Sequence, residues 1–424
     1  MRAKPHRSLP EPAQQQIAME REFYIYRLPN GIKGIHRRVR SSITHCALVI
    51  NAGTRDELRS EYGLAHFAEH AFFKGTEHRK AYQVNCRLEN LGGELNAYTT
   101  KEDTTIHATT LRTDFRKAVE LIADIAFHST FPERELAKER EVIIDEINTY
   151  KDSPSDMLFD TFEDMLFEGS ELGHNILGTK LSLAKHNGDA IRRFIARTHT
   201  TDQMVFSSVG NLSVEAVERV ATTYLGGYTP TTRTFHRESP ASTPLFDKSV
   251  ARHTHQTHCI VGGRAYDIHD DKRLPLSLLI NFLGGPSANS RLNIALREKN
   301  GLSYNNEAIY TPYSDCGYVA IYFSCDHHNT DLCRDIIAKE LHSLRTTTLS
   351  PRQLSMTKRQ FLAQMAISME NNEGYMLGAG KSLLLHDEID TLQEVYRKVS
   401  AVTAEQIREV AEEIFTDTST LIYQ

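Results

Sequence analysis

The sequence lacks the features that would place it in a membrane or on the secretory route. No stretch approaches the run of about eighteen apolar residues that spans a bilayer, and the first twenty residues lack the apolar core of a signal peptide. A short organellar transit segment is the alternative, and Glu11 and Glu20 count against it because such segments are poor in acidic residues. The six cysteines form no C-x-x-C pair, which fits reduced thiols. We therefore expect a cytoplasmic protein with no membrane partner.

The sequence also lacks a surplus of positive charge and any nucleotide-binding motif. Its formal net charge is −6 and its pI is about 6.4, whereas a nucleic-acid binder normally gathers a basic surplus on one face. Nothing in it resembles a P-loop or the glycine-rich fingerprint of a dinucleotide-binding fold. We therefore exclude nucleic acid as a partner.

The length and composition predict two globular domains. A chain of 424 residues is too long for one ordinary core, and 40% apolar with 25% charged residues is typical of folded proteins. Between Gly226 and Val250 the apolar periodicity gives way to Gly, Pro, Thr and Ser. We therefore divide the chain into a flexible N-terminal segment (1–20), a first domain (21–227), a linker (228–250) and a second domain (251–424).

The two predicted domains show signs of an internal duplication. Thr44-His45-Cys46, in an early strand of the first half, is echoed by Thr257-His258-Cys259 at an offset of about 210 residues. At a similar offset, the turn Gly92-Gly93-Glu94-Leu95 is echoed by Asn300-Gly301-Leu302-Ser303. A constant offset favours the duplication of one structural unit.

Each half has the pattern of strands followed by helices. Asn30-Gly31 predicts a hairpin turn between strands at 24–28 and 32–39, and another strand follows at 46–52. Strands mixed with helices in this order indicate the α+β class and exclude a doubly wound sheet. The apolar periodicity predicts helices at 113–128, 133–151, 155–167, 213–224, 274–299, 329–346, 351–385 and 403–414.

His66, Glu69 and His70 form one half of a candidate metal site. On a helix, histidines four residues apart present both imidazoles on one face about a turn apart, the separation that a tetrahedral zinc needs. Glu69 shares this face and can act as general base on a water held at the open position of the metal. The far side of the predicted helix is apolar and consists of Leu64, Phe67, Ala68 and Ala71.

The predicted helix 133–151 supplies the missing ligand. Glu139 and Glu146 lie seven residues apart beside its apolar stripe, where a carboxylate is costly unless it is paired or bound to a metal. We assign Glu146 as third ligand, with one position left for water, and expect Glu139 to steady a ligand histidine or the water. The alternative is that both carboxylates pair with Arg or Lys in an interdomain contact. The stripe consists of Leu136, Ile143, Ile147 and Tyr150, with Val142 flanking it.

Two other groups of histidines are weaker candidates for a metal site. On a strand, His253 and His255 share one face while His258 points to the other, so the three cannot converge without a bend. His327-His328 lies in a polar turn and is expected to be solvated.

These segments resemble the pitrilysin/insulinase family of zinc metallopeptidases, the inverzincins, over nearly the whole chain. The similarity rests on the run 63–70, on Phe73-Lys74-Gly75-Thr76 after it, and on the segment 139–146 with its spacing from His70. The length resembles the short subgroup of mitochondrial processing peptidase subunits and bacterial processing-type peptidases. The resemblance implies one Zn²⁺ per chain and hydrolysis of peptide bonds. It also implies two α+β domains, each with a mixed, mostly antiparallel sheet packed with helices, that form half of a clamshell around a chamber.

The resemblance extends to two further motifs. Arg297 and Tyr304 resemble the R-x-x-x-G-L-x-Y pair of the family, whose guanidinium and phenol would donate hydrogen bonds to the substrate or the developing oxyanion. The alternative for this pair is an ordinary strand tyrosine with an arginine near a helix end. For Asn96 of the second motif, the alternative is an asparagine that only shapes a turn. The other motif resembles the N-A-x-T edge strand, which takes an extended substrate and whose Asn assists near the scissile carbonyl; it consists of Asn96, Ala97, Tyr98 and Thr99.

The resemblance also suggests substrates and partners. Substrates would be short or unfolded peptides, because a folded domain could not enter the chamber. A chain that carries both the zinc motif and the Arg297–Tyr304 pair favours a homodimer, in which the pair would reach each zinc from the facing chain; a heterodimer with a related subunit is the alternative. Competing functions are a dedicated maturation protease for one precursor and a silent peptide-binding scaffold subunit. A scaffold would lack a ligand, and none is missing here.

Overall fold

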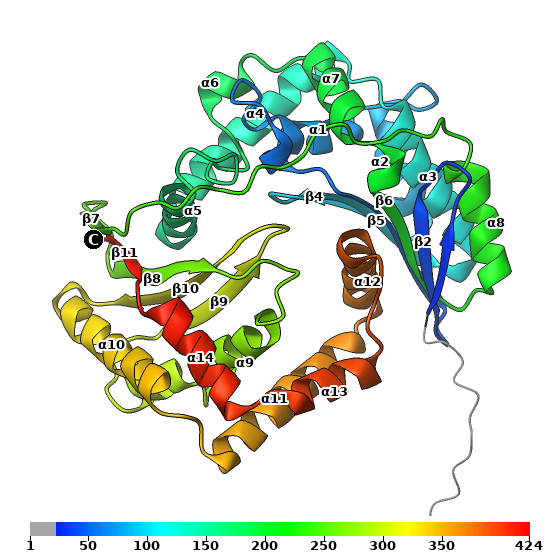
Figure 1. Ribbon diagram of the computed structural model, residues 1–424. Coiled ribbons are helices and arrows are strands. Elements are labelled where there is room, and N and C mark those ends of the chain that lie inside the picture. Colours follow the sequence, from blue (N-terminus) through cyan, green and yellow to red (C-terminus); the bar gives the residue numbers. More distant parts are fainter. Residues whose placement is uncertain (1–22) are drawn as a thin grey trace, which may run out of the picture.

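The computed structural model describes residues 23–424, which form two α+β halves (Figure 1). The N-terminal segment 1–20, expected to be flexible, lies outside the described residues. Within the described range, no helix combines the length and the apolar character needed to cross a membrane. The predicted fold class is confirmed, because each half pairs a mixed sheet with its own layer of helices.

The first half is built on a six-stranded sheet in the order β1-β2-β6-β3-β5-β4. Neighbouring strands are antiparallel, except for the parallel pair β2 and β6. The predicted hairpin joins β1 to β2, and its Gly31 has a φ of 97°, a left-handed conformation that glycine adopts without strain. The strands are β1 (Tyr24–Arg27), β2 (Lys33–Arg38), β3 (Ile43–Ile50), β4 (Glu94–Thr99), β5 (Thr104–Leu111) and β6 (Met204–Gly210).

Helices cover one face of this sheet and bury the largest apolar core of the first half. Phe67 and Phe72 pack there against Leu48 and Ile50 of β3, and all four side chains are fully buried. Apart from α5, the helices of this half are α1 (Leu64–Phe72), α2 (Ala81–Glu89), α3 (Phe115–His128), α4 (Glu133–Lys151), the single turn α6 (Lys180–Leu183), α7 (Gly188–Thr198) and α8 (Val214–Leu225); α5 (Pro154–Leu166) packs on the other half. The helices predicted at 113–128, 133–151 and 213–224 are therefore present, within two residues at each end.

The second half repeats this plan with five strands in the order β7-β11-β8-β10-β9. Here the parallel pair is β7 and β11, and the other neighbours are antiparallel. The strands are β7 (Asp247–Val250), β8 (Thr257–Ala265), β9 (Asn306–Pro312), β10 (Gly317–Cys325) and β11 (Ser419–Tyr423). One face is covered by α9 (Arg273–Gly284), α10 (Thr330–Thr346) and α14 (Ala404–Phe415), whose apolar side chains share a core with β8 and β10.

The strand pairings confirm that the two halves are versions of one unit. The pairing partners and directions of β3, β5, β4, β6 and β2 recur in the second half, where the equivalent strands are β8, β10, β9, β11 and β7 in that order. The echoed tripeptides Thr44-His45-Cys46 and Thr257-His258-Cys259 lie in the equivalent strands β3 and β8.

Each half also sends one helix onto the sheet of the other half. α12 (Asn372–His386) packs against β3 and β6 of the first sheet, while α5 (Pro154–Leu166) packs against β8 and β11 of the second. Gly380 permits the close approach of α12, because a Cβ there would lie 2.9 Å from Val49 Cγ2 and 3.0 Å from Ser207 Cβ. Both sheets are therefore covered on two faces, and neither half is complete without the other.

Several expected elements end elsewhere. The predicted helix 274–299 is wrong, because α9 stops before Gly285-Pro286 and only a short helix, Asn293–Glu298, follows. The predicted helix 351–385 is divided into α11 (Pro351–Met369) and α12, since the side chain of Asn371 accepts hydrogen bonds from two backbone N–H groups and starts a new helix. An additional helix, α13 (Leu392–Ala401), follows a capping box at Thr391 and Glu394.

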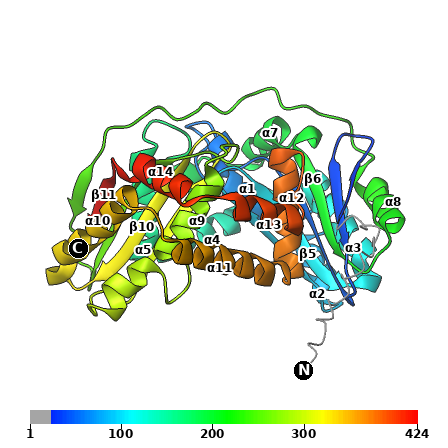
Figure 2. The ribbon, with the colours of Figure 1, turned by 60° about the horizontal axis from the view of Figure 1, so that its bottom comes forward.

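The connection between the halves is shorter than the expected linker 228–250. Its last four residues form β7, so the segment without helix or strand ends at residue 246. This segment crosses the molecule as extended chain from α8 to β7 (Figure 2).

A buried ionic cluster ties the two halves together where their hairpin tips meet. Arg55 donates two hydrogen bonds of 2.7 Å to the carboxylate of Asp315, in the β9–β10 turn, and one of 2.6 Å to Glu102, in the β4–β5 turn. Glu102 also accepts from the backbone N–H and the hydroxyl of Ser314. Arg237 of the connecting segment joins the cluster through Asp56. Because Arg55 is 4% exposed, its charge depends on these partners.

We predict that Arg55→Met lowers the free energy of unfolding by about 3–5 kcal/mol, because the change leaves buried carboxylates without their partner. Chemical denaturation followed by circular dichroism measures the loss. Arg192→Met is the matched control, since Arg192 pairs with Asp189 on the surface and should cost about 0.5 kcal/mol or less. Equal effects of the two substitutions would contradict a role of the cluster in joining the halves.

Candidate metal centre

Helix α1 presents His66, Glu69 and His70 on one face. The opposite face packs into the core with Leu64, Phe67, Ala68 and Ala71, each at most 1% exposed, so the helix cannot rotate about its axis without exposing apolar surface. The two imidazole rings lie 4.5 Å apart between centroids. The orientation predicted for this helix is therefore the one that the structure has.

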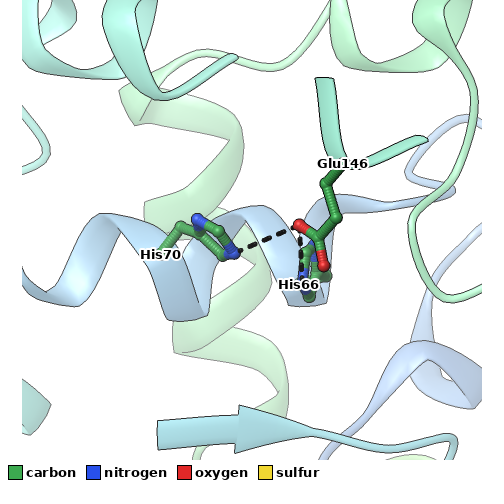
Figure 3. Close-up of side chains that lie close together, drawn as sticks. All are labelled: His66, His70 and Glu146. Atoms are coloured by element: carbon green, nitrogen blue, oxygen red, sulfur yellow. Dashed lines mark ion pairs between the residues drawn. The ribbon is translucent and has the colours of Figure 1, made fainter. Parts of the chain in front are cut away.

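Glu146 of α4 faces the two histidines. Its Oε2 lies 3.8 Å from His66 Nε2 and 3.7 Å from His70 Nε2 (Figure 3). These separations are too long for hydrogen bonds. In a tetrahedral zinc site with bonds of about 2.0–2.1 Å, ligand atoms lie about 3.3–3.4 Å apart, so the three side chains surround a space of the right size for an ion.

The three side chains also have the right chemistry for a metal. Burial lowers the pKa of His66 to about 3, and the neighbouring His70 adds to the effect, so the imidazole is neutral at neutral pH, the form that binds metals. Among the described residues, His66, His70 and Glu146 form the one group of three or more His, Cys, Asp or Glu side chains whose ligand atoms converge, all within 4.8 Å of one another.

Glu139 fixes the orientation of His70. Its Oε1 accepts a hydrogen bond of 2.9 Å from His70 Nδ1, and its Oε2 lies 2.6 Å from Lys74 Nζ. Burial opposes ionisation of Glu139, but the bonds from His70 and Lys74 outweigh it and lower its pKa. Glu139 therefore has the contact with a histidine that the sequence suggested and also pairs with a lysine, as in the alternative, although that lysine belongs to the same half. The carboxylate leaves His70 Nε2 free to face Glu146.

Glu69 lies buried beside this group and next to the edge strand β4. It is 8% exposed; burial raises its pKa, while His70 and Thr99 oppose the effect and Glu146 adds to it. Thr99 is the last residue of β4, which pairs with β5 alone and so forms one edge of the first sheet. A buried carboxylate therefore lies next to a strand edge that can accept another extended chain.

Comparisons with known proteins agree with this geometry. Residues 36–180 match the family model of insulinase, peptidase family M16, and residues 185–361 match the model described as peptidase M16 inactive domain. The chain is 32% identical over 370 residues to a Bacillus subtilis protein named uncharacterized zinc protease YmxG, covering 87% of this chain and 89% of that protein. The chain belongs to the insulinase family, peptidase family M16.

Other insulinase-family relatives and two solved structures have the same extent. A Rickettsia bellii protein, also named an uncharacterized zinc protease, is 27% identical over 403 residues. The match covers 95% of this chain and 97% of that protein. A protease from Helicobacter pylori superposes with a TM-score of 0.86 at 19% identity, with 95% of this chain and 99% of that chain covered. A Pseudomonas fluorescens structure described as a peptidase M16 inactive domain gives the same TM-score and identity, with 95% and 97% covered. At these identities the two structures show the fold alone.

The remaining motif residues of the insulinase-family resemblance lie in two places. In β4, Leu95 and Ala97 pack on the core that α1 shares, whereas Asn96 and Tyr98 alternate to the other face, where Tyr98 meets His107. The side chain of Asn96 therefore points away from the face on which Thr99 approaches Glu69.

Arg297 and Tyr304 lie in the second half, in the short helix Asn293–Glu298 and in the segment before β9. The guanidinium of Arg297 stacks 4.5 Å over the ring of Tyr304, which is 76% exposed. Within residues 23–424, no hydrogen bond or ion pair connects either side chain to the metal group.

Two of the histidines in the weaker candidate groups, His258 and His327, have other partners. His258 Nδ1 bonds Tyr322 Oη at 2.8 Å, and His327 bonds Thr257 Oγ1 and Thr254 O through its two ring nitrogens.

Two contributors to the site, Lys74 and Glu57, were given no role from the sequence. Glu57 is fully buried and accepts hydrogen bonds from the backbone N–H groups of Gly63 and Ala65 at the start of α1, and it bonds His174 Nε2 at 2.8 Å. It thereby fixes the helix that carries both histidines. A carboxylate ahead of a helix start is a local signal, whereas the contact with His174 depends on the tertiary fold.

We predict that Glu139→Gln lowers Zn²⁺ affinity about 10–100-fold, because an uncharged amide orients His70 less firmly and Lys74 loses its ion pair. Competition with a chelator of known affinity measures the change, and the melting temperature checks the fold. Glu135→Gln is the control on the same helix, since Glu135 pairs with Lys138 on the surface. Unchanged affinity in Glu139→Gln would show that Glu139 does not support the site.

Proposed function

We propose that this chain is a zinc-dependent endopeptidase that cleaves short or unfolded peptides. The observation that carries the proposal is the convergence of His66, His70 and Glu146 from two helices, with the buried carboxylate of Glu69 beside them. The names of the relatives as zinc proteases support it. The free edge of β4 supports the substrate class, since only an extended chain can pair with a strand edge.

The ligand set favours zinc over other common cations. Two imidazole nitrogens and one carboxylate form the set found in catalytic zinc sites that keep one open position, whereas Ca²⁺ and Mg²⁺ prefer oxygen ligands. A bound zinc ion would polarise the scissile carbonyl and lower the pKa of a water towards neutrality.

The side chains of this chain would divide the remaining work. Glu69 would accept a proton from the attacking water and deliver one to the leaving amine, and burial brings its pKa closer to neutrality, where a group that both takes and gives a proton is most effective. Glu139 would hold His70 in position through Nδ1. The backbone of 96–99 would bind the substrate as an added strand.

We predict that Glu69→Gln reduces the cleavage of a mixed library of unfolded peptides by about 10²–10⁴-fold while Zn²⁺ binding persists, because the amide cannot accept the proton. Mass spectrometry of the products and metal analysis of the purified protein provide the two readouts. Zinc retained at equal activity in both proteins would overturn the mechanism. A wild-type protein that cleaves only one cellular precursor, and no library peptide, would instead favour a dedicated maturation protease.

We further propose that two chains associate face to face, and that Arg297 and Tyr304 act on the metal site of the facing chain. The exposed ring of Tyr304 and the Arg297 guanidinium stacked on it are both accessible to a second chain. Both side chains can donate hydrogen bonds to a peptide carbonyl or a developing oxyanion. A related subunit in place of the second copy is the alternative.

A mixing experiment tests this arrangement. In a dimer of one Glu69→Gln chain and one Tyr304→Phe chain, one of the two sites would combine an intact Glu69 with an intact Tyr304 from the facing chain. We therefore expect co-expressed chains to show more activity than the two variants measured separately. Activity equal to the sum of the separate variants would show that Tyr304 acts within its own chain. Analytical ultracentrifugation gives the oligomeric state of each sample.

A further inference from the structure

A cavity of about 620 Å³ lies between the two halves and has no assigned role. Its volume falls within the range of about 300–1,000 Å³ typical of ligand sites. The first half contributes the β4–β5 turn, residues 100–103, together with Ile176. The second half contributes Ile268, Tyr313 and residues of α12, among them Gly378 and Leu385.

The cavity begins where the edge strand of the metal site ends. Thr100 lines it, and the preceding residue, Thr99, lies next to Glu69. A peptide paired with the free edge of β4 advances about 3.3 Å per residue, so within a few residues of the cleaved bond it leaves β4 and meets the cavity. The position of the cavity therefore suits a substrate segment better than an unrelated ligand.

The charged groups in the cavity wall already have partners: Asp160 accepts from Asn175, Glu163 accepts from Tyr313, and Arg273 bonds His386. Lys381 pairs with Asp103 at 2.6 Å, and Lys101 donates to the backbone carbonyl groups of Leu172 and His174. Glu102 belongs to the ionic cluster with Arg55. A charged ligand would have to displace these contacts.

Six apolar side chains form a further part of the wall, beside polar groups such as Asn51, Thr311 and Ser382. The apolar side chains come from four separate segments of the chain, so the apolar surface surrounds an occupant on several sides. These residues are Ile176, Ile268, Pro312, Tyr313, Leu384 and Leu385. Burying a large apolar side chain against them would stabilise a complex through the hydrophobic effect.

We propose that this cavity is a specificity subsite that receives a large apolar side chain of the peptide bound along β4, a few residues from the cleaved bond. The proposal rests on the proposed peptidase function. It assigns the selection of substrates to the contact between the halves, whereas the metal group lies within the first half alone.

Gly378 offers a direct test, because a Cβ built there meets nothing within 4 Å. In the middle of α12, Gly378→Leu should fill the cavity without a clash and without breaking the helix. We expect the variant to lose at least tenfold in kcat/KM for peptides with Leu or Phe at the selected position, and less than twofold for peptides with Ala there. For the Leu- and Phe-containing peptides, the kcat/KM of Gly378→Ala should fall between that of Gly378→Leu and that of the wild type.

Gly374→Leu is the matched control, since Gly374 lies one turn earlier on α12, outside the cavity wall, and its Cβ would meet Asn371 only at ordinary contact distances. Cleavage profiles of a position-scanned peptide library, read by mass spectrometry, identify the selected position. Thermal melts monitor the fold of each variant. A Gly378→Leu cleavage profile equal to that of the wild type would overturn the proposal. A loss of Leu- and Phe-containing substrates in Gly374→Leu as large as in Gly378→Leu would also overturn it.

Binding measurements separate this proposal from the peptidase function. Fluorescence anisotropy with the same labelled peptides is measured on Glu69→Gln and on Glu69→Gln/Gly378→Leu. We expect the double variant to bind Leu- and Phe-containing peptides at least tenfold more weakly and Ala-containing peptides equally. If the wild type cleaves nothing but this difference appears, the subsite stands and the peptidase function fails. If cleavage is normal and no difference appears, the subsite fails alone.

Discussion

The reciprocal packing of α5 and α12 is the constraint on which the rest of the structure depends. Each helix leaves its own half and covers the sheet of the other, so the second apolar face of each sheet is buried only by the other half. Separating the halves would expose both faces, which makes the two units one body although each has its own core. The buried cluster around Arg55 acts at the same contact and fixes the hairpin tips against each other. The position of β4 relative to α12, and with it the cavity between them, follows from this packing.

The candidate metal centre contrasts a buried carboxylate that is paired, Glu139, with an exposed one that is not, Glu146. Glu139 and Glu146 lie on the same helix, but Glu139 has both oxygens occupied by His70 and Lys74, whereas Glu146 has no Lys or Arg partner among the described residues. The surroundings also act on His70: burial would lower its pKa, yet the bond to Glu139 and the charges of Glu69, Glu139 and Glu146 raise it. Such surroundings attract a cation, and a metal ion supplies one without requiring a protonated histidine.

The parts of the site that could be predicted from the sequence are those fixed by spacing along one helix. His66, Glu69 and His70 share a face of α1 because of the helical repeat, and Glu139 and Glu146 on α4 follow the same rule. Val142, expected to flank the apolar stripe of α4, is 51% exposed, and Glu146 is exposed as well, so the apolar face of α4 is narrower than the periodicity indicated. The contacts of Lys74 with Glu139, of Thr99 with Glu69 and of Glu57 with His174 depend on which elements meet in three dimensions, and no local sequence pattern indicates this.

The break after α9 was signalled by Gly284-Gly285-Pro286, but the apolar periodicity on both sides concealed it. The exchange of α5 and α12 could not be predicted. The sequence of an amphipathic helix indicates that the helix packs on an apolar surface, but it does not indicate which of the two sheets provides that surface.

In the proposed mechanism, chemistry and substrate selection would occupy different parts of this molecule. The side chains of the metal group all come from α1 and α4 in the first half, and the model matched by residues 185–361 is described as an inactive domain. Yet the second half contributes α12 to the first sheet and a wall to the cavity at the end of β4. Changes in α12 would therefore alter the space available to a peptide while leaving α1 and α4 in place, because the two helices are held by a separate core. A duplicated unit that lacks the metal residues would in this way retain a direct influence on the reaction, through the shape of the contact that it makes with its active counterpart.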